Sequence, residues 1–310
     1  MKKTLIAFII SIPLILIVGY YKPQSENPQV RSKVYSDRFW ALKVTQKPIY
    51  DMVIIGDSRT YRGIAPQAIN ESLPDYKIYN FAFSSGGLNK TIYKEAENLL
   101  NNNSDKPKII LIGATPYSLT KDSSLNKHYK KENERPLEEK FQRIYVNPLL
   151  KFIFPIKITA LQDKIRGEKE KLKLYYYQDF YDNGWVASYI IPNNDEEQLD
   201  AYKRDFTKWN ISDKLVNDLV EQIKRWKNKG IKIFVLRPPT TEKMELLENK
   251  LSGYVEFEIK NKIEKSGGYW ITLENRYNYK SYDGSHLHKD SAFEFSNKVG
   301  HFIANKIKEL

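Results

Sequence analysis

The chain has 310 residues, no cysteine, and 50 lysines and arginines against 38 acidic residues, which gives a formal charge of +12. With 41% hydrophobic residues it can bury a core, so a wholly disordered chain is excluded. The lack of cysteine excludes disulfide scaffolds, thiolate metal sites and cysteine nucleophiles. Only four histidines are present, so we expect no metal site, and no motif calls for a cofactor.

An apolar run at the N-terminus, residues 5–18, follows Lys2 and Lys3 and precedes Tyr20 and Tyr21. Its length is borderline for crossing a thin bilayer, and tyrosines at the interface favour an uncleaved anchor. A cleaved secretory signal has the same basic start and apolar middle, but no good small-x-small cleavage site follows. A buried core helix is the third interpretation.

These features predict the domain organisation. Residues 1–21 are expected to form a membrane anchor or uncleaved signal, and the polar, proline-containing residues 22–48 a stalk. The basic start holds the N-terminus in the cytoplasm, so residues 49–310 are expected to face the periplasm or the cell exterior.

Short apolar runs and amphipathic segments alternate along residues 49–310. Runs rich in β-branched residues predict buried parallel strands at 52–55, 78–81, 109–112, 231–236 and 269–272. Helical periodicity predicts helices at 66–73, 88–101, 212–229 and 290–310. The alternation predicts an α/β three-layer sandwich around a central parallel sheet.

An insertion at about 118–210 is not required by this sandwich. Its segment 121–173 carries 14 basic and 8 acidic residues, half of the chain's excess charge, and an aromatic stretch at 175–181 and Trp185 follow. We expect a mostly helical cap near the mouth of the sheet, with aromatic rings that stack on sugars. A solvated face with its own small core is the plainer interpretation.

Gly56-Asp57-Ser58 directly follows the first predicted strand. In parallel sheets, ligands bind beyond the carboxyl ends of the strands, so Ser58 is a candidate nucleophile. An ordinary turn in which Asp57 or Ser58 caps the next helix is the alternative.

A second polar segment, Asp283-Gly284-Ser285-His286, precedes the last predicted helix. A serine nucleophile needs a general base, and an imidazole base needs a carboxylate to orient it. Asp283 and His286 can supply both groups from one loop. His288 is a competitor, but it lacks a carboxylate at the same spacing.

These segments together resemble the SGNH/GDSL hydrolases, which have a flavodoxin-like α/β/α sandwich and a Ser-His-Asp triad. The resemblance covers residues 52 to the last helix in the family's block order, with residues 80–87 resembling its glycine block. It implies that Ser58 is the nucleophile, His286 the base and Asp283 its orienter.

The resemblance also implies an oxyanion hole built from the backbone N–H groups of Ser58 and Gly86, with Gly87 as the alternative donor. After the third strand the family usually carries Gly-x-Asn-Asp, whereas this chain has Thr115 at the asparagine position. The Thr115 hydroxyl is the candidate third donor. Because the usual asparagine is missing, a pseudoenzyme that retains the triad without activity is the alternative interpretation.

In this departure the chain resembles the divergent, membrane-anchored branch of the family, which includes the SGNH-like proteins of alginate acetylation and of teichoic-acid D-alanylation. The resemblance implies a surface-polymer substrate and a multispanning acyltransferase as partner. Arg59 and Arg237 are candidate substrate-binding residues for a carboxylate or phosphate of such a polymer. The alternative for Arg59 and Arg237, and also for Arg62 beside the candidate nucleophile, is that each arginine forms a structural ion pair.

The expected function is therefore a cell-envelope esterase or O-acetyltransferase that acts on surface polysaccharide. The alternative is a membrane-tethered, catalytically idle protein that binds anionic envelope polymers or acts as a scaffold for an acyltransferase. Nucleic acid is not an expected partner, because basic charge alone is only permissive and an outward-facing domain would rarely meet DNA.

Overall fold

A computed structural model describes residues 9–11, 13–14, 36–150, 175–272 and 274–309. Its central sheet has five parallel strands in the order β2-β1-β3-β6-β7. They are β1 (Met52–Ile55), β2 (Ile78–Asn80), β3 (Ile109–Gly113), β6 (Lys232–Leu236) and β7 (Tyr269–Trp270). The predicted α/β class and central parallel sheet are confirmed. The edge strand β7 is shorter than predicted, since it pairs only with Phe234 and Val235 of β6.

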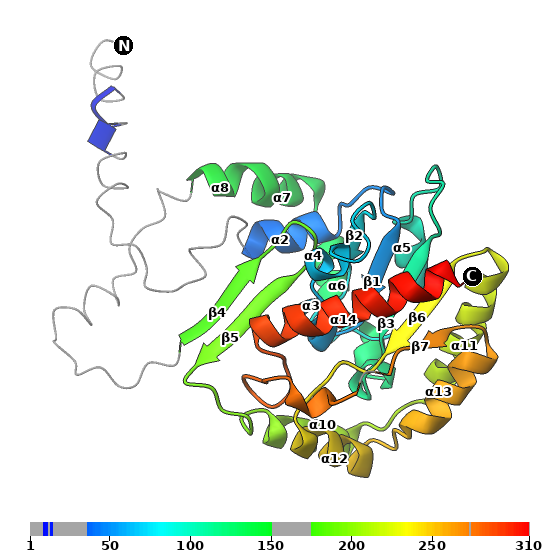
Figure 1. Cartoon of the computed structure of the whole chain (residues 1–310). Helices are drawn as coiled ribbons and strands as arrows, with labels where there is room; N and C mark the ends of the chain where they lie inside the picture. Colours follow the sequence, from blue (N-terminus) through cyan, green and yellow to red (C-terminus); the bar gives the residue numbers. More distant parts are fainter. Residues whose placement is uncertain (1–8, 12, 15–35, 151–174, 273, 310) are drawn as a thin grey trace.

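Helices cover both faces of this sheet, because the strand side chains alternate in direction. Val53 and Ile55 of β1 join one hydrophobic core, and Met52 and Ile54 join the other. The first core is covered by α5 (Lys90–Asn98), α11 (Asp213–Asn228) and α13 (Glu256–Lys265). The second is covered by α4 (Pro66–Asn70) and α14 (Lys289–Lys308), and Figure 1 shows α14 crossing the sheet.

The prediction of a stalk at 22–48 is wrong for residues 36–43, which belong to the folded domain. Residues 36–43 form helix α2 (Ser36–Lys43), which buries Phe39 and Ala41 against the domain. Lys43 of this helix is fully buried and donates to the Gly184 carbonyl at 3.0 Å. The aromatic pair Phe39-Trp40 explains the difference, since Phe39 packs on Phe180 and Trp40 on Tyr61.

The predicted membrane anchor, apart from residues 9–11 and 13–14, and residues 22–35 of the predicted stalk lie outside the described residues. Among the residues that the structure describes, no helix is long and apolar enough to cross a bilayer.

The described part of the insertion is mainly helical, as predicted, but it also contains a β-hairpin that was not predicted. The aromatic stretch forms strand β4 (Tyr175–Phe180), which pairs antiparallel with β5 (Val186–Ile191). Aromatic and β-branched residues favour strands, and the intervening turn contains Gly184 at a φ of +85°. The helical part comprises η2 (Tyr117–Leu119), η3 (Ser123–Leu125), α6 (Lys127–Asn133), α7 (Leu137–Phe141), the π-helix η4 (Gln142–Val146), α8 (Asn147–Leu150) and α10 (Leu199–Lys208).

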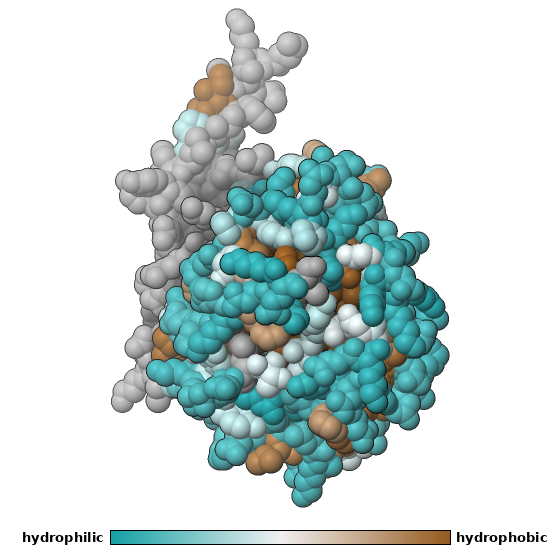
Figure 2. Space-filling view, turned by 45° about the vertical axis from the view of Figure 1, so that its right-hand side comes forward, coloured by the Kyte–Doolittle hydropathy of each residue, from teal (hydrophilic) through white to brown (hydrophobic). Residues whose placement is uncertain are grey.

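Four further helical segments among the described residues were not predicted: α3 (Ser58–Gly63), α12 (Glu242–Leu251), α13 and η6 (Arg276–Asn278). Helix α3 begins directly at the candidate nucleophile. Helix α12 follows β6 and, as shown below, supplies a buried carboxylate next to the site. The surface seen in Figure 2 is mostly hydrophilic, with hydrophobic side chains gathered in small patches.

Candidate active site

Ser58 lies at the carboxyl end of β1, beside which the strand order reverses between β2 and β3. Gly56 makes the tight turn into α3, with a φ of +153°; a Cβ atom there would lie 2.2 Å from Thr60 Oγ1. The Asp57 carboxylate accepts from Arg59 N at 3.0 Å and caps the helix. The turn therefore fixes Ser58 at the edge of the sheet where parallel α/β folds place their ligands.

Ser58, His286 and Asp283 form a continuous hydrogen-bonded relay. Ser58 Oγ lies 2.9 Å from His286 Nε2, and His286 Nδ1 lies 2.7 Å from Asp283 Oδ2. The other oxygen of Asp283 accepts from the backbone N–H groups of Ser285 and His286, at 2.9 and 2.8 Å. These bonds hold the carboxylate in place, so that His286 is oriented with Nε2 toward the serine.

The electrostatics of the relay suit a general base. Burial lowers the pKa of His286 to about 4, and the attraction of Asp283 only partly opposes this effect. Burial on its own would raise the pKa of Asp283, but His286 and the backbone N–H groups hold it below its ordinary value. At neutral pH, His286 is therefore neutral and Asp283 ionised, which is the state that can accept a proton from Ser58.

His288 lies away from Ser58. Its ring accepts from Asp290 N at the start of α14 and packs against Tyr189. It therefore belongs to the helix cap, in agreement with its missing upstream carboxylate.

The candidate oxyanion donors differ in how free they are. Ser58 N–H donates to no residue that the structure describes. Gly86 lies against the nucleophile turn, since a Cβ there would be 2.7 Å from the Gly56 carbonyl oxygen, but its N–H donates to Phe83 O at 3.1 Å. The alternative donor, Gly87 N–H, is bonded to Asn126 Oδ1 at 2.9 Å.

The expectation that Thr115 donates to an oxyanion is not met by its contacts. Its hydroxyl donates to Asp57 Oδ2 and accepts from Ser118 N at 3.0 Å. A threonine hydroxyl has a single proton, so this bond leaves none for a substrate. Burial raises the pKa of Asp57, and the hydrogen bond from Thr115 opposes this rise by stabilising the ionised carboxylate. Thr115 therefore supports the turn that carries Ser58.

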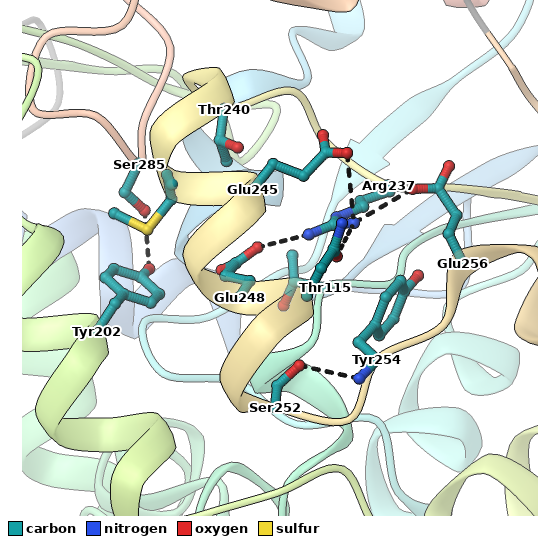
Figure 3. A network of polar contacts seen from close by, with 12 residues as sticks. Thr115, Tyr202, Arg237, Thr240, Glu245, Glu248, Ser252, Tyr254, Glu256 and Ser285 are labelled. Atoms are coloured by element: carbon teal, nitrogen blue, oxygen red, sulfur yellow. Dashed lines mark hydrogen bonds and ion pairs between the residues drawn. The ribbon is translucent and has the colours of Figure 1, made fainter.

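The two candidate substrate-binding arginines are also corrected. Arg59 and Arg237 are buried, and both pair with the fully buried carboxylate of Glu248, at 2.6 and 2.8 Å. Figure 3 shows Glu248 on α12, with Arg237 also facing Glu245 and Glu256. These guanidinium groups hold the structure behind the site together and are not available to a polymer's anionic group.

This buried network continues into the insertion. Arg59 Nε donates to Ser285 Oγ at 2.9 Å, and Ser285 Oγ donates to Tyr202 Oη of α10 at 2.8 Å. The Arg59 guanidinium also lies over the Tyr202 ring, at 4.7 Å from its centroid. The segments that carry Ser58 and His286 are thus joined to each other and to the cap.

Glu248, Tyr202 and Ser285 are the positions that sequence reasoning missed. Glu248 stands in a run of charged residues typical of an exposed helix, and no local pattern marks it as buried. The remaining arginine, Arg62, donates to Tyr282 Oη at 2.8 Å, and Tyr282 stacks on the His286 ring. Trp185 is buried, with its indole N–H on Arg62 O, so it belongs to the core and does not form a sugar platform.

No family model, curated protein or solved structure matches this chain. Within the described part of the chain, no group of three or more histidine and acidic side chains is placed to hold a metal ion.

Proposed function

We propose that this protein is a serine-dependent acyl-ester enzyme of the SGNH type, an esterase or O-acyltransferase for a cell-surface polysaccharide. The observation that carries the proposal is the Ser58–His286–Asp283 relay at the edge of the sheet where the strand order reverses. The order β2-β1-β3-β6-β7 is also that of flavodoxin-like sheets.

The relay supports a two-step acyl transfer. Ser58 Oγ attacks the acyl carbonyl while His286 Nε2 takes its proton, and a tetrahedral oxyanion forms within reach of Ser58 N–H. His286 then gives the proton to the departing alcohol oxygen, which leaves an acyl-serine. In the second step His286 deprotonates water or a sugar hydroxyl, whose oxygen attacks the acyl carbonyl. The bond between the acyl group and Ser58 Oγ then breaks, and His286 returns the proton to Ser58 Oγ. Asp283 stays ionised and stabilises the imidazolium.

The substrate and setting come from the resemblance to the membrane-anchored SGNH proteins. This resemblance implies an acylated envelope polymer as substrate, a single-pass N-terminal anchor, an outward-facing domain and a multispanning acyltransferase as partner. Net charge of +12 favours an anionic polymer over a neutral one.

The alternative is an idle relay in a protein that binds envelope polymers or supports an acyltransferase. It is favoured by one observation: Thr115 Oγ1 and Gly86 N–H are both bonded elsewhere, so Ser58 N–H is the one expected oxyanion donor that remains free among the described residues. Loss of one such donor typically costs about two to three orders of magnitude in rate.

The discriminating experiment is covalent labelling of the full chain in detergent with a fluorophosphonate. The wild type should label, whereas Ser58→Ala and His286→Ala should not. Ser85→Ala, an exposed serine on the neighbouring loop, is the matched control and should label normally. A folded wild type that fails to label contradicts the activated serine and favours the idle protein.

If the serine reacts, acetate release from an acetylated oligosaccharide is measured with and without an unacetylated acceptor. Release that is independent of the acceptor indicates an esterase. Transfer of the acetyl group to the acceptor without free acetate indicates a transferase.

A further inference from the structure

An unusual stripe of apolar side chains is exposed on the segment formed by α7 and η4. Leu137, Phe141 and Tyr145 recur at every fourth position and are 77%, 57% and 58% exposed. Ile49, 43% exposed, lies across the groove. We call Ile49, Leu137, Phe141 and Tyr145 the apolar face. Isolated exposed apolar residues need no explanation, but a contiguous set of this kind marks an interaction surface.

The opposite side of the same segment is fixed to the domain. Ile144 is buried, and Arg143 pairs with Glu132 of α6 and with Asp37 of α2, the latter at 3.0 Å. The stripe is therefore held outward by packing and ion pairs on its inner side.

A groove of about 1110 Å³ runs between this segment and α2. Besides the apolar face, its lining includes Leu42, Lys47 and Lys140, and Glu138 is the one acidic residue among the described residues that line it. An apolar surface with lysines at its margin is the pattern of proteins that lie on anionic lipid, and tyrosine is favoured at the membrane interface.

The sequence on either side of the apolar face also favours contact with a membrane. The apolar run at 5–18 precedes α2, the first helix of the domain and one wall of the groove. From the end of α8 onward, residues 149–158 contain eight apolar residues, two lysines and no acidic residue in their sequence. Sequences suited to a membrane thus flank the apolar face on both sides in the chain.

We propose that the apolar face rests on the surface of an anionic bilayer and orients the domain on the membrane. This inference rests on the anchor interpretation of the N-terminus and is independent of any chemistry at Ser58. A second copy of the chain and a partner protein are the other occupants, and the experiment separates them from lipid.

The test exploits the absence of cysteine. Phe141→Cys in the full chain is labelled with an environment-sensitive fluorophore and reconstituted into vesicles of phosphatidylcholine and phosphatidylglycerol that contain spin-labelled lipid. Phe257→Cys on α13 is the control, because Phe257 is 71% exposed and α13 lies at the other end of the domain (Figure 1). Leu137→Cys is the replacement if the first variant misfolds.

The expected result is a blue shift and lipid-dependent quenching at position 141, with neither at position 257. Lys47→Glu with Lys140→Glu should weaken the quenching on anionic vesicles and leave flotation of the chain unchanged. The proposal is overturned if position 141 is no more quenched than position 257. Energy transfer between labelled copies without quenching by lipid would assign the face to a second copy. Failure of the chain to float with vesicles would overturn both the anchor and the face.

Discussion

Two regions of the molecule reverse the usual distribution of side chains. Behind the relay, Arg59, Arg237 and Glu248 are buried although they are charged, whereas at α7 and η4 the apolar side chains of Leu137 and Phe141 are exposed. Buried charges are tolerated only when they are paired, and exposed apolar stripes require a covering surface. The first region meets its requirement within the domain, and the second depends on something outside it.

The largest effect is expected at the relay, where Asp283→Asn removes the carboxylate that orients His286. The asparagine favours the wrong imidazole tautomer, so we expect the rate of fluorophosphonate labelling to fall by about 10⁴. Asp290→Asn, an exposed aspartate on α14, is the control and should label at the normal rate. Normal labelling of Asp283→Asn would mean that the relay does not activate Ser58.

The buried network should dominate stability on this side of the sheet. Glu248→Gln leaves Arg59 and Arg237 without their shared carboxylate, and breaking a buried ion pair costs about 3–5 kcal/mol. The free energy of unfolding from a urea titration measures this loss. The exposed Glu242→Gln on the same helix should change it little. If Glu248→Gln and Glu242→Gln lowered the unfolding free energy equally, the buried ion pairs of Glu248 would not stabilise this region.

The pH dependence tests the burial of the relay. His286 must be neutral to act as base, so the labelling rate should fall as the pH drops through about 4 and be constant at neutral pH. In the unfolded chain the histidine has its ordinary pKa near 6.5. The unfolded state therefore binds the proton first, and the stability contributed by neutral His286 is lost as pH falls from about 6.5 toward about 4. A midpoint of labelling near 6.5 would show that His286 is not desolvated.

A smaller effect is expected where the network meets the cap. Tyr202→Phe removes the acceptor of the Ser285 hydroxyl, and a single hydrogen bond of this kind contributes about 1 kcal/mol. Urea titration measures the change, with Tyr277→Phe on the exposed segment η6 as control. An unchanged unfolding free energy would indicate that α10 is not held through Tyr202.

The smallest effect is expected on the apolar face. Leu137→Gln should change the free energy of unfolding by no more than about 0.5 kcal/mol, because exposed substitutions rarely do more. Ile144→Gln, about two turns away but buried, should cost several times as much because it buries an amide. Comparable losses at both positions would mean that Leu137 packs within the domain.

Much of the fold could be predicted because each buried strand has its own local signal. The run Met-Val-Ile-Ile predicts β1 without any knowledge of its neighbours, since parallel strands covered on both faces are apolar throughout. The relay was predictable for another reason: Gly56 and Asp57 mark the turn after β1, and Asp283 precedes His286 by three residues on one loop.

The roles of the arginines and of Thr115 could not be predicted in the same way. Arg59 follows Ser58 in sequence, yet the direction of its side chain depends on Glu248, which lies far along the chain. Thr115 stands where a donor was expected, and only the approach of Asp57 decides where its proton goes. Local sequence gives a side chain's chemistry and not its partner.

The sequence by itself determined the strands of the central sheet, the layered α/β class and the residues of the relay, because hydrophobic periodicity and short motifs act over a few residues. The tertiary structure alone decided that Ser58 and His286 lie within 2.9 Å, that two arginines share one buried carboxylate, and that Leu137, Phe141 and Tyr145 remain uncovered. These facts depend on which distant segments meet, and contact across the fold sets the burial and charge of every side chain involved.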